Sequence, residues 1–316
     1  MEYLQYFILS LGFIALSKSI VKFIIWVWAS FLRPSKNLKE YYGAWVLITG
    51  STDGIGKALA FELAAKGLNL ILVGRNPTKL EDTVNGINEK YGGKISIRTV
   101  VIDFAKCRPD EIVKKIEEEA IFDDVDVGIL INNAGLSYPY AKYLHEVDLE
   151  LMESLMKVNM VGLSCVTKSI IPRMLLKKKG AIVNIGSGSS STVSSYPLYS
   201  VYAATKAYVQ MLSKSLSIEY KQQGIDVQCQ IPLLVATKMT YIKKSSLFIP
   251  SAEAYSKASI KWIGYDEICM PYWPHAIQGF IIRALSEKLV DQILFWYFNG
   301  MRKRGMHRDS KLAKMK

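Results

Sequence analysis

The first 32 residues of the chain are almost continuously apolar. Tyr3–Leu16 forms a nearly unbroken apolar run, Lys18 and Lys22 interrupt the pattern, and Ile20–Leu32 resumes it. A bilayer span needs about 20 predominantly apolar residues, so neither half suffices alone and the whole segment exceeds that length. The pattern predicts a membrane-associated N-terminal helix. Three arrangements fit it: a tilted span whose lysines reach the interface, a shallow hairpin, or a helix lying in the interface.

The residues that flank this segment indicate its orientation. Met1-Glu2 carries no basic side chain, and no small-x-small cleavage site follows the apolar run, so a cleaved signal peptide fits poorly. Arg33, Lys36 and Lys39 follow the segment directly. Because basic residues accumulate on the cytoplasmic side of membrane spans, we expect the rest of the chain to face the cytosol.

From residue 44 onward, short apolar runs alternate with longer segments of helical periodicity. A short run that is apolar throughout is typical of a strand buried on both faces. Strands are expected at Ala44–Ile48, Asn69–Val73, Thr99–Ile102, Gly128–Ile131, Ala181–Ile185 and Ile225–Ile231, and helices at Lys57–Lys66, 79–91, 110–120, 149–176 and 201–222. This alternation predicts an α/β fold with a Rossmann-type doubly wound parallel sheet.

The chain length fits one such domain behind the anchor. The chain has 316 residues, and a single α/β domain of roughly 260 residues is common. We therefore assign residues 1–39 to the membrane anchor, 40–300 to one α/β domain and 301–316 to a basic tail.

The formal net charge of +12 admits nucleic-acid binding as one interpretation. The tail contains only one acidic residue, Asp309. It contains seven basic residues, which are Arg302, Lys303, Arg304, Arg308, Lys311, Lys314 and Lys316. Much of the excess is thus expected in a flexible tail, which suits an anionic membrane surface at least as well as nucleic acid. The sequence contains no recognised nucleic-acid-binding module, so we expect no nucleic-acid partner.

Cysteines and histidines give no metal-binding pattern. The four cysteines lie far apart without a C-x-x-C motif, and the three histidines are widely separated. The sequence predicts free thiols in a reducing compartment and no metal site.

A glycine-rich turn follows the first expected strand. Its candidate cofactor-binding residues, in the spacing G-x-x-x-G-x-G, are Gly50, Ser51, Thr52, Asp53, Gly54, Ile55 and Gly56. Strand, glycine turn and helix are the opening of a dinucleotide-binding domain, in which glycines let the backbone approach the pyrophosphate and the helix N-terminus favours the phosphates. Alone the turn is a weak signal; the strands around it strengthen the interpretation.

The ends of the next strands indicate which dinucleotide binds. NAD-preferring domains place an acid about 20 residues after the glycine turn, at the end of the second strand. Here Arg75-Asn76 stands there, and a guanidinium suits a 2′-phosphate. We therefore predict NADP(H). Asp103, after the third strand, is placed to reach the adenine, and the fourth strand ends in the candidate residues Asn133, Ala134 and Gly135.

A tyrosine, a lysine and a group of serines carry the candidate chemistry. Tyr202 and Lys206 are four residues apart, so they share one helix face. A free tyrosine, with a pKa of about 10, is a poor acid at neutral pH, and a nearby ammonium lowers that pKa. A serine hydroxyl at a strand end can hold a substrate carbonyl oxygen, and residues 187 and 189–191 are serines after the fifth strand.

These motifs in this order resemble the short-chain dehydrogenase/reductase superfamily over about residues 42–250. The segments 183–188, 196–202, 224–230 and 235–239 resemble especially the membrane-bound branch that contains plant-type very-long-chain 3-oxoacyl-CoA reductases and 17β-hydroxysteroid dehydrogenases. The resemblance implies Tyr202 as proton donor and Lys206 as the residue that lowers its pKa and binds the nicotinamide ribose. It also implies Asn159 in a water-linked proton relay, and Asn133, Gly135 and Thr237 at the cofactor.

Two positions fit the family pattern less simply. Counting from the fifth strand selects Ser187 as the catalytic serine, whereas counting thirteen residues back from Tyr202 selects Ser189. We prefer Ser187 because a strand end fixes position better than a loop. After the sixth strand the family has Pro-Gly, but this chain has Pro232-Leu233. The family pattern therefore does not predict the conformation of this turn.

The resemblance implies a substrate as well as a reaction. It implies reduction of long-chain 3-oxoacyl-CoA to 3-hydroxyacyl-CoA in fatty-acid elongation at the endoplasmic reticulum, with membrane lipids and other elongase-complex enzymes as partners. Aromatic residues between 240 and 300 fit core helices or an apolar channel for an acyl chain. Two alternatives remain: a 17β-hydroxysteroid or other lipid-alcohol dehydrogenase, and a non-catalytic scaffold of an elongase complex.

Overall fold

The computed structural model describes residues 1–121 and 125–314, which separate into two compact units, residues 1–35 and 36–316. In the first unit α1 (Glu2–Val27) continues into the π-helical turn η1 (Trp28–Leu32). This is one helix, long and apolar enough to cross a membrane, with no buried residue. The hairpin alternative was wrong, because Lys18 and Lys22 are accommodated within the helix. The first unit also ends a few residues before the predicted boundary at residue 39.

The second unit is built on a seven-stranded parallel sheet in the order β3-β2-β1-β4-β5-β6-β7. The strands are β1 (Trp45–Thr49), β2 (Asn69–Gly74), β3 (Ile97–Val101), β4 (Val127–Asn132), β5 (Gly180–Ile185), β6 (Ile225–Gln230) and β7 (Ile268–Cys269). The predicted doubly wound sheet is confirmed. Strand β7 was not predicted, because two residues are too short to give a pattern.

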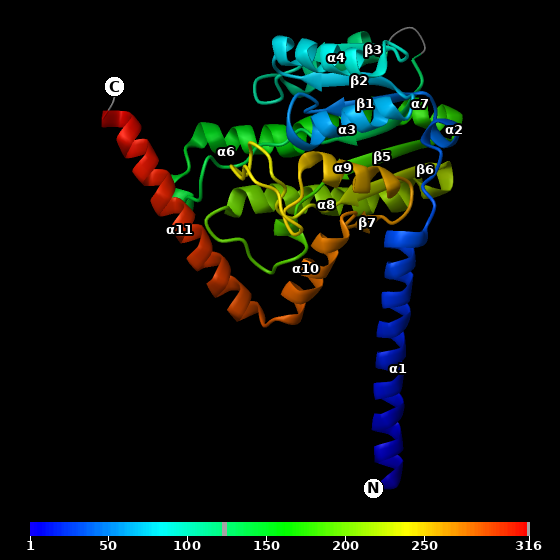
Figure 1. The fold of residues 1–316 in the computed structure, drawn as a ribbon, viewed down its shortest axis with the longest axis vertical. Coiled ribbons are helices and arrows are strands. Elements are labelled where there is room, and N and C mark those ends of the chain that lie inside the picture. The colour runs from blue at the N-terminus through cyan, green and yellow to red at the C-terminus, as the bar shows by residue number, and fades with distance from the viewer. Residues whose placement is uncertain (122–124, 315–316) are drawn as a thin grey trace. The chain divides into compact units, whose positions relative to one another are not determined.

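Helices cover both faces of the sheet (Figure 1). They are α2 (Leu38–Tyr42), α3 (Gly54–Ala65), α4 (Pro77–Tyr91), α5 (Pro109–Lys115), η2 (Ile116–Ala120), η3 (Leu144–Glu146), α6 (Leu149–Met156), η4 (Lys157–Gly162), α7 (Leu163–Lys177), η5 (Gly188–Ser190), α8 (Ser200–Tyr220), η6 (Lys221–Gln223), α9 (Ala252–Lys261), α10 (Trp273–Ala284) and α11 (Glu287–Lys314). The switch in strand order, between β1 and β4, places their carboxyl ends side by side, where ligands of such sheets bind.

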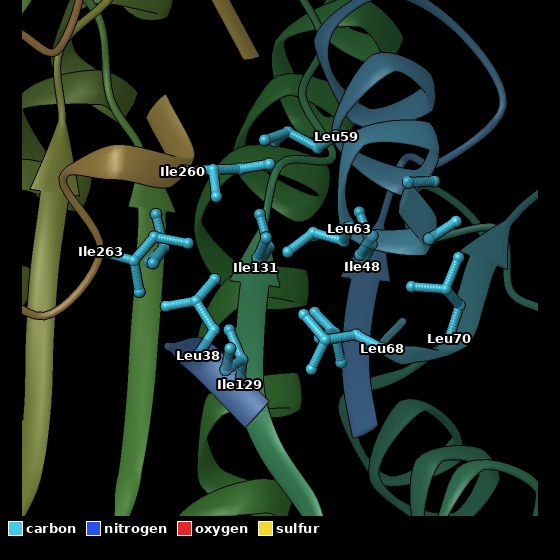
Figure 2. Close-up of a cluster of buried hydrophobic side chains, with 14 of the residues drawn as sticks. Leu38, Ile48, Leu59, Leu63, Leu68, Leu70, Ile129, Ile131, Ile260 and Ile263 are labelled. Carbon is cyan, nitrogen blue, oxygen red and sulfur yellow. The ribbon is translucent and has the colours of Figure 1, made fainter. Parts of the chain in front are cut away.

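Alternate residues of each central strand enter two separate cores. Ile48 and Leu70 pack with Leu59 and Leu63 of α3 on one face (Figure 2), whereas Leu47 lies in the core on the other face. Both faces are buried beneath helices, which explains why these strands are apolar throughout.

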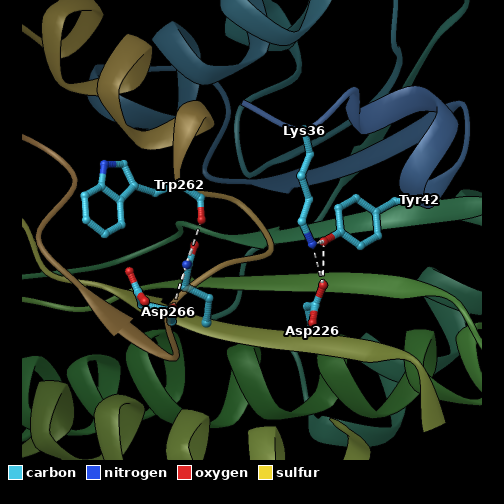
Figure 3. Close-up of polar contacts among 6 residues, drawn as sticks. Lys36, Tyr42, Asp226, Trp262 and Asp266 are labelled. Carbon is cyan, nitrogen blue, oxygen red and sulfur yellow. Dashed lines mark hydrogen bonds and ion pairs between the residues drawn. The ribbon is translucent and has the colours of Figure 1, made fainter. Parts of the chain in front are cut away.

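A polar cluster ties the start of the second unit to the sheet (Figure 3). The Tyr42 hydroxyl donates to Oδ2 of Asp226 at 2.5 Å, and Lys36 Nζ lies 3.3 Å from the same oxygen. Burial and the neighbouring Asp226 carboxylate raise the pKa of Tyr42. The phenol therefore remains protonated and holds α2 against β6.

The C-terminal basic segment is helical, contrary to the flexible tail we predicted. Helix α11 passes through residue 301 without a break and continues to Lys314. Nε of Arg302 donates to Glu146 at 2.9 Å, and a Cβ on Gly305 would clash with the ring of Tyr140. The tail is helical because residues beyond 300 still pack on the domain. Lys316 lies outside the described residues.

Candidate active site

The glycine turn joins β1 to α3 in close contact with the end of β4. Gly50 has φ +64°, and a Cβ there would meet Ala134 Cα at 2.8 Å. Asn133 Nδ2 donates to the carbonyl oxygens of Thr49 and Gly50, each at 3.0 Å. A side chain on Gly56 would clash with the Gly50 carbonyl. These two glycines are therefore required by the packing of the turn itself, a reason that sequence spacing did not reveal.

Other predicted residues of the turn have structural contacts. Ser51 is buried and its hydroxyl donates to Val73 O at 3.2 Å, which ties the turn to β2. The Thr52 methyl group lies against Gly74. Asp53 caps α3 by accepting from Gly54 N at 2.8 Å, and Ile55 O accepts from Ser256 of α9.

Arg75, Asn76 and Asp103 follow the ends of β2 and β3. Arg75 is exposed at the end of β2. Asn76 is the N-cap of α4, because its Oδ1 accepts from Lys79 N at 3.0 Å. Asp103 Oδ1 accepts from Ala105 N at 3.1 Å. Arg75 is thus exposed at this edge, while the other two side chains also shape their turns.

Tyr202 and Lys206 lie on one inward face of α8, as predicted. Lys206 is 6% exposed, and its Nζ donates to Ile185 O at 2.9 Å. Burial lowers the pKa of Lys206 to about 8. A Cβ on Gly135 would lie 3.6 Å from this Nζ and 3.6 Å from Asn159 Oδ1. The structure therefore brings Gly135, Asn159 and Lys206 together.

Burial is the largest effect on Tyr202. It raises the pKa of the phenol, and a hydrogen bond with Ser187 acts in the opposite direction. Lys206 directs its ammonium to the Ile185 carbonyl. The lowering of the Tyr202 pKa by Lys206 therefore stays a prediction.

The two candidate serines have different positions. Ser187 follows β5 and is hydrogen-bonded to Tyr202. Ser189 is 7% exposed; its hydroxyl donates to Ser187 Oγ at 3.0 Å, and its N–H lies 3.2 Å from the same atom. Ser189 thus reaches the tyrosine only through Ser187.

Asn159 lies in the π-helical turn η4 and is 1% exposed. Its Nδ2 donates to Leu136 O and Thr205 Oγ1, each at 2.9 Å, and its Oδ1 accepts from Leu136 N at 2.7 Å. The side chain thereby holds the loop after β4 against α8. The relay implied by family resemblance stays a prediction beside this structural role.

The loop after β6 lies beside the glycine turn. The Thr237 methyl group would be 3.2 Å from a Cβ on Gly54, and Lys238 Nζ lies 2.9 Å from Asp53 Oδ2. Burial alone would raise the pKa of Asp53, but Lys238 and the Gly54 N–H hold it below its usual value. A hollow of about 900 Å³ borders this loop, α3 and α9. The Asp53–Lys238 pair gave no signal in the sequence, because its members lie far apart in the chain.

Pro232-Leu233, the departure from the family pattern, has a defined turn. Leu233 N donates to Nδ1 of the buried His275 at 3.2 Å, and the Leu233 side chain occupies the space beside Gly188. Burial lowers the pKa of His275 to about 4. A neutral histidine, which no sequence pattern indicated, therefore supports the turn.

An aromatic cluster that was also missed borders the catalytic helix. Tyr196 and Tyr199 pack edge-on to Phe298 of α11, with ring centroids 4.7 and 5.1 Å apart, and Tyr199 stacks on Tyr138 at 5.2 Å. Burial raises the pKa of Tyr199 to about 12. Helix α11 thus forms part of the wall behind Tyr202.

The chain matches the short chain dehydrogenase family over residues 44–246 and therefore belongs to it. The predicted family is confirmed. The chain is 44% identical to a very-long-chain 3-oxoacyl-CoA reductase-like protein of Arabidopsis thaliana, over 95% of each chain. It is 37% identical to very-long-chain 3-oxoacyl-CoA reductase of Rattus norvegicus, over 85% of this chain and 84% of that one. It is also 37% identical to inactive hydroxysteroid dehydrogenase-like protein 1 of Homo sapiens, over 82% and 77%.

Solved structures share this fold. A structure described in a study of 7beta-hydroxysteroid dehydrogenase stereoselectivity has a TM-score of 0.70 and 23% identity, and the match covers 82% of this chain and 99% of that chain. A short-chain dehydrogenase from Sphingobium yanoikuyae in complex with NADPH has a TM-score of 0.61 and 25% identity, over 75% and 94%.

Proposed function

We propose that the protein is an NADPH-dependent reductase of very-long-chain 3-oxoacyl-CoA, acting in fatty-acid elongation. The observation that carries the proposal is the group formed by Tyr202, Ser187 and the buried Lys206, with the phenol hydrogen-bonded to Ser187 at the end of β5. The names of the Arabidopsis and rat relatives support the substrate class. The 3-oxo group becomes a 3-hydroxyl group.

The residues around the glycine turn fit a dinucleotide. The first turn of α3 contains two glycines, Gly54 and Gly56, which contribute no side chain there, and such helix ends favour phosphates. Arg75 would hold the 2′-phosphate, Asp103 the adenosine, and Asn133, Gly135 and Thr237 the remainder of the cofactor. NADPH, when bound, supplies the hydride that reduces the 3-oxo carbon.

The protein's own residues supply a proton and hold the oxygen. The Tyr202 hydroxyl donates its proton to the carbonyl oxygen, and Ser187 hydrogen-bonds that oxygen as negative charge develops. Because burial raises the pKa of Tyr202, the phenol is protonated before the reaction. The ammonium of Lys206 then favours the phenolate that remains, and Asn159 keeps the loop after β4 beside the lysine.

The N-terminal helix supports a location at a membrane. We propose that Glu2–Leu32 anchors the enzyme in the endoplasmic reticulum and that the domain faces the cytosol, where Arg33, Lys36 and Lys39 would remain. Membrane lipids and other elongation enzymes are the expected partners, because acyl chains of this length reside in the bilayer.

The test measures NADPH oxidation by the full-length protein in detergent, with long-chain 3-oxoacyl-CoA and, separately, an oxosteroid. We expect turnover of the acyl-CoA and a loss of roughly 10³-fold or more in Tyr202→Phe. Tyr208→Phe, which removes another hydroxyl from α8, one bonded to Ser164 at 2.8 Å, should remain active. Preference for the oxosteroid would favour the steroid alternative, and an active Tyr202→Phe protein would contradict the proposed chemistry.

A further inference from the structure

The elbow between α10 and α11 exposes large apolar side chains. Trp296 is 78% exposed and Phe280 is 72% exposed, and neighbouring residues on both helices are also exposed. We call this set the elbow surface; it consists of Phe280, Ile281, Leu285, Leu289, Ile293 and Trp296. Figure 1 shows α10 and α11 meeting at this bend. Several large apolar side chains exposed on two helices that meet at a bend are typical of an interaction site.

Helix geometry separates the two sides of α11. Val290 and Phe298 are buried and lie on the inner side, where Phe298 packs on Tyr196. At about 100° per residue, Leu289, Ile293 and Trp296 share the opposite side. The exposed stripe is therefore not part of the domain core.

The same outer stripe becomes basic in the second half of the helix. Lys303, His307 and Lys311 continue the line of Leu289, Ile293 and Trp296, and all three are exposed. Arg304 borders it. A helix face that is apolar first and basic afterwards, with a tryptophan at the transition, matches the boundary between acyl chains and anionic headgroups.

We propose that the elbow surface enters the interface of a bilayer and that the basic half of α11 lies on anionic headgroups. The inference rests on the membrane location proposed above. Residues 33–37 connect the N-terminal helix to α2 without helix or strand and extend at most about 17 Å, which keeps the domain close to the lipid. One lipid surface satisfies both halves of the stripe, whereas an apolar partner would leave the cations facing it.

The consequence for the enzyme is that one helix contacts both the lipid and the surroundings of the active site. The outer side of α11 contacts the bilayer, while its inner side, through Phe298, forms the wall next to the aromatic residues that precede Tyr202. Helix α11 therefore lies between the proposed lipid contact and the aromatic residues beside Tyr202.

The test uses full-length protein in phosphatidylcholine vesicles, with and without phosphatidylserine, that contain a lipid carrying a photoactivatable diazirine. We expect labelled peptides from residues 280–296 in addition to 1–32, with more label when phosphatidylserine is present. Leu176 and Ile218, which are 87% and 73% exposed on other helices, serve as internal controls and should remain unlabelled. Label confined to residues 1–32, or equal label at the elbow and the controls, would overturn the proposal.

Paired variants exclude other occupants. Phe280→Ser with Trp296→Ser should reduce elbow labelling about tenfold or more, while Leu176→Ser with Ile218→Ser should not change it. If the elbow variant instead converts a dimer to a monomer in light scattering, without loss of lipid label, the surface joins two copies and the proposal is wrong. Tyr202→Phe protein should label as wild type does, so failure of the proposed reaction and failure of lipid contact are separable.

Discussion

Ser187 and Ser189 are two residues apart, but only Ser187 is hydrogen-bonded to Tyr202. We expect Ser187→Ala to lower kcat by roughly 10²- to 10³-fold, because a donor to the developing negative charge is lost. Ser189→Ala should lower kcat less than about tenfold, since Ser189 acts only by orienting Ser187. Steady-state NADPH oxidation measures both. If Ser187→Ala retains a kcat near that of the wild type, Ser189, which lies thirteen residues before Tyr202, is the better candidate for the catalytic serine.

Arg75 determines the expected cofactor preference. Replacing it by aspartate should lower the NADPH-to-NADH ratio of kcat/KM by roughly 10- to 100-fold, because a charge-assisted bond to the 2′-phosphate is worth about 1.5–3 kcal/mol. Lys66→Asp, an equal charge change at the exposed far end of α3, is the control and should leave the ratio unchanged. The assignment of Arg75 fails if its variant retains the wild-type ratio.

Residue spacing predicted Tyr202, Lys206 and Ser187 because they lie at fixed offsets within one helix and one strand end. Asp53–Lys238 and His275–Leu233 could not be predicted in this way, because each contact joins distant parts of the chain. Such pairs depend on tertiary packing, which leaves no periodicity in the sequence.

Helix α11 packs beside the catalytic residues, and replacing Phe298 measures how much this helix contributes to stability and activity. Phe298 is 4% exposed between Tyr196 and Tyr199, so Phe298→Ala should lower the free energy of unfolding by about 3 kcal/mol and also reduce kcat/KM. Phe295→Ala, at a side chain of the same helix that is 41% exposed, should cost less than about 1 kcal/mol. Chemical denaturation compares them, and equal losses would show that Phe298 is not a packing residue.

The strands were predictable as elements because both faces of the sheet are covered, which makes each run apolar. The N-terminal and C-terminal helices were harder to predict. The charges of Lys18 and Lys22 suggested an interruption of the N-terminal helix, and the basic residues after Gly300 suggested a flexible tail. Both segments are nevertheless continuous helices. In α11 the contacts of Phe298, Arg302 and Gly305 with the domain stabilise the helix. They do so although the basic composition had suggested a flexible tail.

At the scale of the whole molecule, the candidate membrane-spanning helix and the candidate active site belong to different units. The first unit has no buried residue in its helix, whereas the second has its own sheet, cores and site. The Lys36, Tyr42 and Asp226 cluster fixes the point where the second unit begins. The sequence located this division to within a few residues, because the apolar segment ends where basic residues start.

The stability of the second unit should depend on pH through His275. Its folded pKa of about 4 lies below the usual 6.5, because the ring is buried. Leu233 N donates to Nδ1, whereas the Leu234 carbonyl beside Nε2 acts in the opposite direction and only partly offsets the effect of burial. The unfolded state therefore binds the proton more readily, and this contribution is complete above pH 6.5 and lost as the pH falls toward 4. Between pH 7.5 and pH 5 we expect a loss of about 2 kcal/mol, seen in urea unfolding of detergent-solubilised protein. His275→Gln removes the titrating group, so its pH slope should be shallower by that amount; an identical slope in both proteins would assign the acid sensitivity to other groups.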